Sequence, residues 1–168
     1  MTLLVQYTLI FASVLALVAL GGCFSEHSGV INIGLEGIMV MGALGGALAM
    51  KFIPASTPGI VLFILIVLTS VLVGMVFSLF LGVAAIHFNA DQTLVGTALN
   101  LMGTAAAVVI VRAINVAENP DNVSSTVVYR QAKQVFLVKI GDFEFNWFML
   151  LVVLAIIASH VVLYKTKF

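Results

Sequence analysis

Five long runs of apolar residues, almost free of charge, dominate this chain. They lie at about residues 3–22, 29–50, 60–86, 94–112 and 145–164. A helix that crosses a bilayer needs roughly 20 mostly apolar residues. Charged residues make up 8% of the chain, against roughly 25% in an ordinary soluble domain, so a polar shell cannot cover five buried helices. The sequence therefore predicts an all-α integral membrane protein with about five transmembrane helices in the lipid bilayer, forming a single domain over residues 1–168.

The segments between these runs differ in character. Residues 52–59 contain two prolines, which end helices. Residues 87–93 form a short polar turn, and residues 113–144 form the one extensive polar loop. Within this loop, the β-branched stretches 124–129 and 134–140 are predicted to pair as a small hairpin.

Several classes of function find no support in the residues. The net charge is zero, whereas a nucleic-acid partner calls for a basic surface. The single cysteine, Cys23, and three isolated histidines offer no multi-residue metal site, and no nucleophile lies beside a base in sequence. No phosphate-binding loop of the G-x-x-x-x-G-K-[ST] type occurs. We therefore expect no catalytic residue, cofactor or metal in this chain, and no nucleic-acid partner.

Small residues recur at helical spacing inside three of the runs. Such residues let helix backbones approach closely in lipid, where the hydrophobic effect does not drive helix association. We interpret them as helix-packing positions. They are Gly42 and Gly46 in the second run, Ser70, Gly74, Ser78 and Gly82 in the third, and Gly96 in the fourth.

A carboxylate interrupts the second run. Glu36 lies one helical turn from Asn32, so both side chains are expected on one helical face. Ionisable groups at membrane depth usually face a bundle interior or a water-filled path, and the neighbouring Gly34 and Gly37 permit a break in the helix. Two interpretations stay open: a pathway or hinge element, or a structural carboxylate bonded to backbone amides. Asn100 in the fourth run is a weaker candidate of the same kind, with an interhelical hydrogen bond as its alternative.

The same stretch carries a family resemblance. Residues 28–39, SGVINIGLEGIM, and residues 89–101, NADQTLVGTALNL, resemble two motifs of the permease subunits of ABC importers for simple sugars, nucleosides and branched-chain amino acids. The residues of the first motif are most similar to those of the nucleoside or general-sugar branch of the family. The ending LYKTKF is a third match, and the three together extend over nearly the whole chain in the expected order.

The resemblance implies a multi-pass protein of the plasma membrane of a prokaryote. It also implies partners: an ABC ATPase subunit that hydrolyses ATP, a second permease subunit, and a lipoprotein that binds the solute. Members of the family continue past such an ending into a cytoplasmic coupling helix that contacts the ATPase. This chain therefore resembles the amino-terminal half of a permease.

Orientation and function each leave an alternative. By resemblance the carboxyl terminus, with Lys165 and Lys167, is cytoplasmic, and residues 113–144 lie outside. The segments that this orientation places outside hold more Lys and Arg residues than those inside, and this excess favours the opposite orientation. The alternative function is a small structural or proton-relay membrane subunit of a respiratory complex. A relay would be favoured by several intramembrane ionisable residues, but Glu36 stands alone among the predicted spans.

Overall fold

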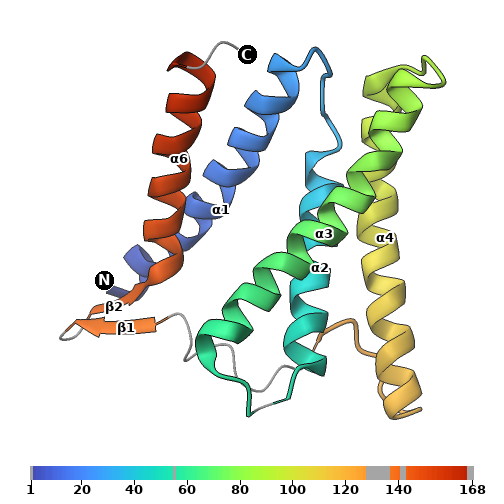
Figure 1. The fold of residues 1–168 in the computed structure, drawn as a ribbon. Helices are drawn as coiled ribbons and strands as arrows, with labels where there is room; N and C mark the ends of the chain where they lie inside the picture. The colour runs from blue at the N-terminus through green and yellow to red at the C-terminus, as the bar shows by residue number, and fades with distance from the viewer. Residues whose placement is uncertain (1, 55, 128–136, 141–142, 166–168) are drawn as a thin grey trace. The chain divides into compact units, whose positions relative to one another are not determined.

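In a computed structural model, the described residues of the protein form five long helices and a short hairpin (Figure 1). The structure describes residues 2–54, 56–127, 137–140 and 143–165; for residues 2–3 and 137–147 only the backbone is described. The elements, in chain order, are α1 (Thr2–His27), α2 (Leu35–Phe52), α3 (Gly59–Ile86), α4 (Gln92–Glu118), β1 (Leu137–Ile140), β2 (Phe143–Asn146) and α6 (Trp147–Lys165). All five helices are long and apolar enough to cross a membrane, which confirms the predicted fold class.

Two predicted boundaries are wrong in an informative way. The second helix starts at Leu35, so residues 29–34 are not helical. The fourth helix continues to Glu118, so the first six residues of the predicted polar loop 113–144 belong to it. Polar contacts with other helices account for both shifts, and hydropathy alone does not report such contacts.

The predicted hairpin has the wrong partner. Residues 137–140 do form a strand, β1, but β1 pairs antiparallel with β2, and Ile140 lies opposite Phe143. Residues 124–127 have no regular structure, and residues 128–129 lie outside the described residues. Closing a hairpin across a short connection costs less chain entropy than closing one across a longer loop, which favours the pairing observed.

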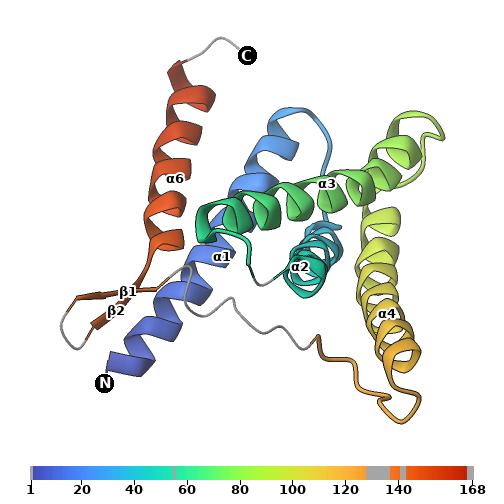
Figure 2. The same ribbon diagram turned by 60° about the horizontal axis from the view of Figure 1, so that its bottom comes forward.

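The chain divides into two compact units. The first comprises residues 1–29 and 133–168. In it, α1 and α6 lie side by side, and the hairpin leads into the start of α6 (Figures 1 and 2). At the end of α1, Gly29 adopts a φ of 82°. This left-handed conformation, which glycine adopts without strain, is common where helices end.

The second unit, residues 30–132, is built around α2, which packs against both α3 and α4 (Figure 1). The α2–α3 contact is close because α2 presents glycines. A Cβ on Gly45 would lie 2.8 Å from Cγ2 of Val73. The core of the unit is a cluster of Phe77, Leu81 and Leu99. Many other apolar side chains stay exposed, as expected for helices that face lipid.

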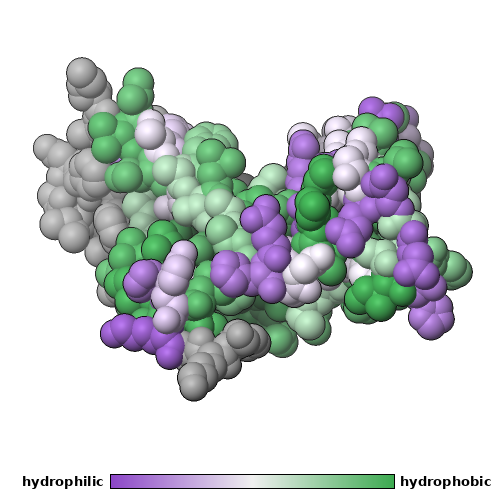
Figure 3. All heavy atoms as spheres, turned by 90° about the horizontal axis from the view of Figure 1, so that it is seen from above, coloured by the Kyte–Doolittle hydropathy of each residue, from purple (hydrophilic) through white to green (hydrophobic). Residues whose placement is uncertain are grey.

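A short turn connects α3 and α4 at one end of this unit. Asn89 takes a positive φ of 49°, a conformation that Asn tolerates better than most residues. Asp91 then caps α4: its carboxylate accepts hydrogen bonds from the backbone N–H groups of Thr93 at 2.8 Å and Leu94 at 3.2 Å. Figure 3 shows this end of the molecule, where hydrophilic residues reach the surface among hydrophobic ones.

Replacing the cap should destabilise α4 measurably. In Asp91→Ala the N–H groups of Thr93 and Leu94 lose their acceptor, and such losses cost about 1 kcal/mol. We expect a lower thermal unfolding midpoint in detergent, measured by circular dichroism. Asp91→Asn keeps a side-chain oxygen for the same two donors, so its midpoint should stay close to that of the wild type. Equal midpoints for the wild type and Asp91→Ala would contradict the assignment.

Candidate functional site

The candidate site lies where the non-helical segment 30–34 meets the first turn of α2 and the amino-terminal half of α4. Gly34 precedes α2 and has no side chain with which to cap it. The capping group comes instead from another helix. The Oδ1 atom of Asn100 accepts a hydrogen bond from the backbone N–H of Gly37 at 2.8 Å, and its Nδ2 donates to the carbonyl of Ile33 at 2.9 Å.

These two bonds explain why α2 starts late. In an α-helix, the carbonyl of residue i accepts from the N–H of residue i+4, and Ile33 and Gly37 are such a pair. The carboxamide of Asn100 bonds to both groups and so takes the place of the direct hydrogen bond between them. The regular α2 ladder then runs from the bond of Ile38 N–H to the Gly34 carbonyl, 3.1 Å long. Broken helices in membranes need neighbouring side chains of this kind, because lipid offers no hydrogen bonds.

Glycines make the approach of Asn100 possible. A Cβ on Gly37 would lie 2.9 Å from the Cα of Asn100, and a Cβ on Gly103 would lie 2.9 Å from the Cα of Gly37. One turn earlier, a Cβ on Gly96 would lie 2.9 Å from the backbone nitrogen of Gly34. The α2 and α4 backbones are therefore nearly in contact over two turns, and any side chain at these positions would separate them.

The prediction that Asn32 and Glu36 lie on one helical face is wrong. Asn32 precedes the helix, so the two residues do not share a helical face. The Oδ1 atom of Asn32 is buried and has no hydrogen-bond partner within the described part of the chain. Glu36 lies in the first turn of α2 with its side chain exposed. A carboxylate there is favoured by the positive end of the helix dipole.

A second polar contact fastens segment 30–34 to α4. The backbone N–H of Ile31 donates to Oε1 of Gln92 at 2.8 Å. Gln92 is the first residue of α4. Together with Asn100, it gives the non-helical segment polar partners on α4 at two levels, so α4 holds this segment by side chains.

A separate polar cluster joins the opposite ends of α2 and α4. The ammonium group of Lys51 lies 2.9 Å from a carboxylate oxygen of Glu118 and 3.3 Å from Oδ1 of Asn115. The Lys51 side chain is only 11% exposed, whereas that of Glu118 is 57% exposed. Lys51 is in the last turn of α2, where a cation is favoured by the helix dipole.

Asn115 is the centre of this cluster. It is 3% exposed, and its Nδ2 donates to the carbonyls of Ser124 at 2.9 Å and Thr126 at 3.0 Å. Asn115 thus holds residues 124–126 against the end of α4 while it accepts from Lys51. This cluster explains why α4 continues beyond the apolar run.

The predicted packing positions fall into three groups. Gly42, Gly46, Ser70 and Gly74 meet at the α2–α3 contact, where a Cβ on Gly42 would lie 3.2 Å from the carbonyl oxygen of Ser70. Gly96 belongs to the α2–α4 contact described above. Ser78 bonds to the Met75 carbonyl within its own helix at 2.8 Å, and a Cβ on Gly82 would meet no atom within 4 Å in the described chain.

Sequence reasoning missed several residues of these contacts. They are Gly45, Lys51, Gln92, Gly103, Asn115 and Glu118. A signal for Gly103 was present, since it follows Gly96 by seven residues and Asn100 by three. Positions spaced by three and four alternately stay on one helical face, whereas a strict spacing of four drifts away from it. The remaining residues had no such signal.

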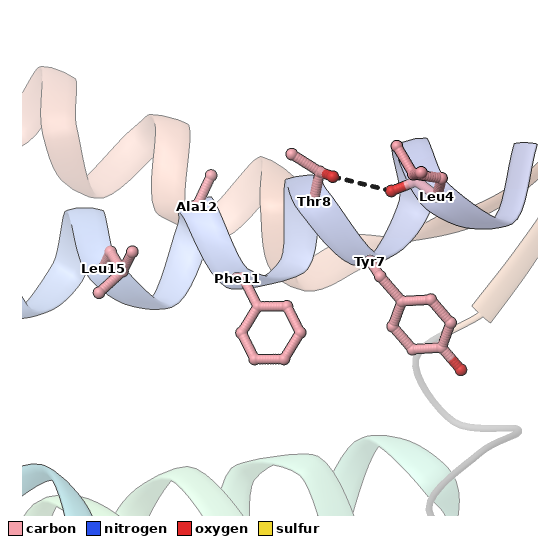
Figure 4. Close-up of a pocket in the computed structure, with 6 residues that line it drawn as sticks. All are labelled: Leu4, Tyr7, Thr8, Phe11, Ala12 and Leu15. Carbon is pink, nitrogen blue, oxygen red and sulfur yellow. Dashed lines mark hydrogen bonds between the residues drawn. The ribbon is translucent and has the colours of Figure 1, made fainter. Parts of the chain in front are cut away.

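Two hollows on the surface are apolar. One runs along α1 and is lined by Leu4, Tyr7, Thr8, Phe11, Ala12 and Leu15 (Figure 4). There Tyr7 and Phe11 project from the same side of the helix, and Thr8 is tied to the Leu4 carbonyl at 2.8 Å. The other is lined by Met41, Leu72, Val73, Val76, Phe77 and Phe80. Neither offers the convergent polar groups that orient a polar ligand.

Fold and site together define a class. The helices are long and apolar enough to cross a membrane, a non-helical segment precedes α2, and side chains of α4 bond to the backbone groups at its start. Non-helical segments that are bonded to neighbouring helices are found in membrane transport proteins.

Comparison with known proteins gives the family. The model of the family described as branched-chain amino acid transport system / permease component matches residues 4–168. This chain belongs to that family, which confirms the resemblance noted in the sequence. Together with the five apolar helices, membership makes it a multi-pass protein of the plasma membrane.

Two bacterial permeases are among the proteins similar to it. The guanosine ABC transporter permease protein NupQ of Bacillus subtilis is 42% identical over 118 residues, which are 68% of this chain and 35% of NupQ. The nucleoside ABC transporter permease protein NupC of Lactococcus lactis is 32% identical over 171 aligned residues, 99% of this chain and 53% of NupC. The chain thus spans about half the length, or less, of these relatives. No solved structure gives a significant match.

Proposed function

We propose that this chain is the part of an ABC importer permease that contributes α1 to α4 and α6 to the translocation pathway for nucleosides or simple sugars. The observation that carries the proposal is the similarity over 99% of the chain to a nucleoside ABC transporter permease. A putative glucose ABC transporter permease protein of Haloferax volcanii, TsgC13, is 51% identical over 43 residues. That shorter match, over 26% of this chain, keeps simple sugars as the second solute class.

The partners follow from the family. We propose that a separate ABC ATPase subunit hydrolyses ATP, that a second permease subunit completes the pathway, and that a lipoprotein delivers the solute. The chain itself then needs no catalytic residue or cofactor. The family match favours this function over a respiratory subunit, and the carboxylate of Glu36 is exposed in the first turn of α2.

Uptake in cells tests the proposal. The gene that encodes this chain is deleted in its native organism, and the initial uptake of radiolabelled guanosine, adenosine and glucose is measured. We expect the loss of nucleoside uptake, restored by the intact gene on a plasmid. Loss of glucose uptake alone would assign the solute to the sugar class. Unchanged uptake of all three solutes, with no other nucleoside or sugar losing transport, would contradict the proposal.

The orientation in the membrane is a further prediction. By family resemblance, residues 119–127 lie outside the cell and the turn at residues 87–91 lies in the cytoplasm. The native Cys23 is exposed, so it is first replaced by Ser. Val123 and Phe88 are 60% and 73% exposed and lie at opposite ends of α4. A membrane-impermeant maleimide added to intact cells should label Val123→Cys and spare Phe88→Cys. The reverse pattern would establish the orientation that the lysine and arginine count favours.

A further inference from the structure

The position of the Asn100 carboxamide is unusual. It separates a carbonyl and an N–H, those of Ile33 and Gly37, that are four residues apart and would bond directly if α2 began one turn earlier. A side chain inserted in this way is a recognised cause of a break in a helix. The group that bonds to Ile33 and Gly37 belongs to α4, so the start of α2 depends on where α4 lies.

We propose that Asn100 is the latch of a two-state hinge at residues 30–37. With the latch closed, as in this structure, α2 begins at Leu35. With the latch open, Ile33 and Gly37 bond to each other, residues 30–34 join α2 as an added helical turn, and the N–H of Ile31 leaves Gln92. The link to solute transport rests on the proposed function, whereas the hinge itself does not.

Hydrogen bonding allows both states. In the closed state, the Ile33 carbonyl and the Gly37 N–H each bond to Asn100. In the open state, they bond to each other and the Asn100 side chain is released. The N–H groups of Gly34, Leu35 and Glu36 would gain the carbonyls of residues 30–32 in the open state, whereas first-turn donors have no helical acceptor in the closed one. The buried Oδ1 of Asn32 has no partner among the described atoms of the closed state, and such groups mark a conformation that carries a cost.

The glycines let the same contact open and close. Gly34, which precedes α2, lies against Gly96 of α4, and Gly37 on α2 lies against Gly103, so the backbones approach closely at both pairs. A small shift of α4 therefore moves Asn100 relative to Ile33 without a side-chain clash. Helix α2 lengthens by about 1.5 Å for each residue it gains. The latch thus converts a displacement of α4 into a change in the length and direction of α2.

Hydrogen–deuterium exchange separates a latch from a fixed cap. The full-length permease in nanodiscs is compared as wild type and as Asn100→Leu, whose side chain has the same branched shape and number of heavy atoms but no amide. If Asn100 holds the hinge closed, its removal extends α2, and exchange of the backbone amides of residues 34–36 slows by roughly tenfold. If Asn100 only stabilises a permanent helix end, its removal frays that end. Faster or unchanged exchange at residues 34–36 would overturn the proposal.

Two further variants keep the test decisive. Thr97→Val makes a comparable polar-to-apolar change on α4, where Thr97 is exposed and bonds to its own helix at the Thr93 carbonyl; its exchange should match the wild type. If Asn100→Leu does not fold, Asn100→Asp replaces it. The aspartate keeps the acceptor for Gly37 but loses the donor to Ile33, so we expect a smaller slowing at residues 34–36, and faster or unchanged exchange again overturns the latch.

A second measurement tests the link to transport. In the importer assembled with its ATPase, exchange at residues 34–36 should differ between the nucleotide-free and vanadate-trapped states of the wild type, and should not differ in Asn100→Leu. Equal exchange in both states of an importer that transports nucleosides would show that the cycle does not use the hinge. If the importer does not take up nucleosides at all, the proposed function is contradicted. The latch is then tested by the exchange of residues 34–36 in Asn100→Leu alone.

Discussion

Gly37→Leu is expected to destabilise the protein more than any other single substitution considered. Gly37 is buried at the α2–α4 contact, and a Cβ there would already lie 2.9 Å from the Cα of Asn100, with the Leu99 carbonyl closer still. Both obstacles are backbone atoms, which do not move aside by a change of rotamer. Overpacking of this kind costs about 3 kcal/mol or more. The two helices must separate, which also breaks the bonds of Asn100 to Ile33 and Gly37.

The matched control is Gly82→Leu on α3. Gly82 is also a helical glycine, but a Cβ there meets no described atom within 4 Å, and replacing glycine raises helix propensity by up to about 1 kcal/mol. Thermal unfolding in detergent, followed by circular dichroism, compares the two variants. We expect a large fall in the midpoint for Gly37→Leu and no fall for Gly82→Leu. Equal midpoints would mean that α2 and α4 do not meet at Gly37.

Asn115→Leu is expected to have the second-largest effect. The substitution removes the acceptor for Lys51 and the three bonds, to the carbonyl and hydroxyl of Ser124 and the carbonyl of Thr126, that hold residues 124–126 to α4. Lys51 is largely buried and keeps only the exposed Glu118 as a partner within the described chain. Hydrogen bonds to charged groups contribute about 1.5–3 kcal/mol, so we expect a destabilisation of about 2–3 kcal/mol.

A labelling experiment reads out the same substitution independently. In a Cys23→Ser background, Val123→Cys should react faster with maleimide once Asn115→Leu releases the adjoining segment. Asn119→Leu is the control, because Asn119 is exposed and its side chain accepts one local bond, from the N–H of Asp121. An increase in rate caused equally by both substitutions, or by neither, would count against the role of Asn115.

Hydropathy was sufficient to predict the membrane helices, but it did not predict where α2 begins or where α4 ends. Five apolar runs in a chain with few charges left no other fold class open, and the five helices follow them. Helix ends are set by polar contacts between helices. The start of α2 depends on Asn100, 63 residues beyond Gly37 in sequence, and the end of α4 depends on Lys51, 64 residues before Asn115. A local sequence window contains only one member of each pair.

The candidate site was predictable in its members more than in its geometry. Gly34 and Gly37 were singled out because glycines beside Glu36 permit a break in a helix, and Asn100 because it is a polar residue inside an apolar run; the structure brings these three together. Their pairing was not predictable, because packing between helices decides which faces meet. In the sequence, Glu36 was the stronger candidate because its charge is costly in lipid. In the structure, its uncharged neighbours Ile33, Gly34 and Gly37 make the contacts with α4.

The most direct test of the proposed function is transport by the purified importer. The full-length permease, with its ATPase and second permease subunit, is reconstituted into proteoliposomes, and uptake of radiolabelled guanosine is measured in the presence of the binding protein. We predict uptake that requires ATP hydrolysis, stops with vanadate and falls strongly in Gly37→Leu but not in Gly82→Leu. Uptake without ATP, or with equal rates in both variants, would contradict the account of this chain as a pathway-forming part of an ABC importer.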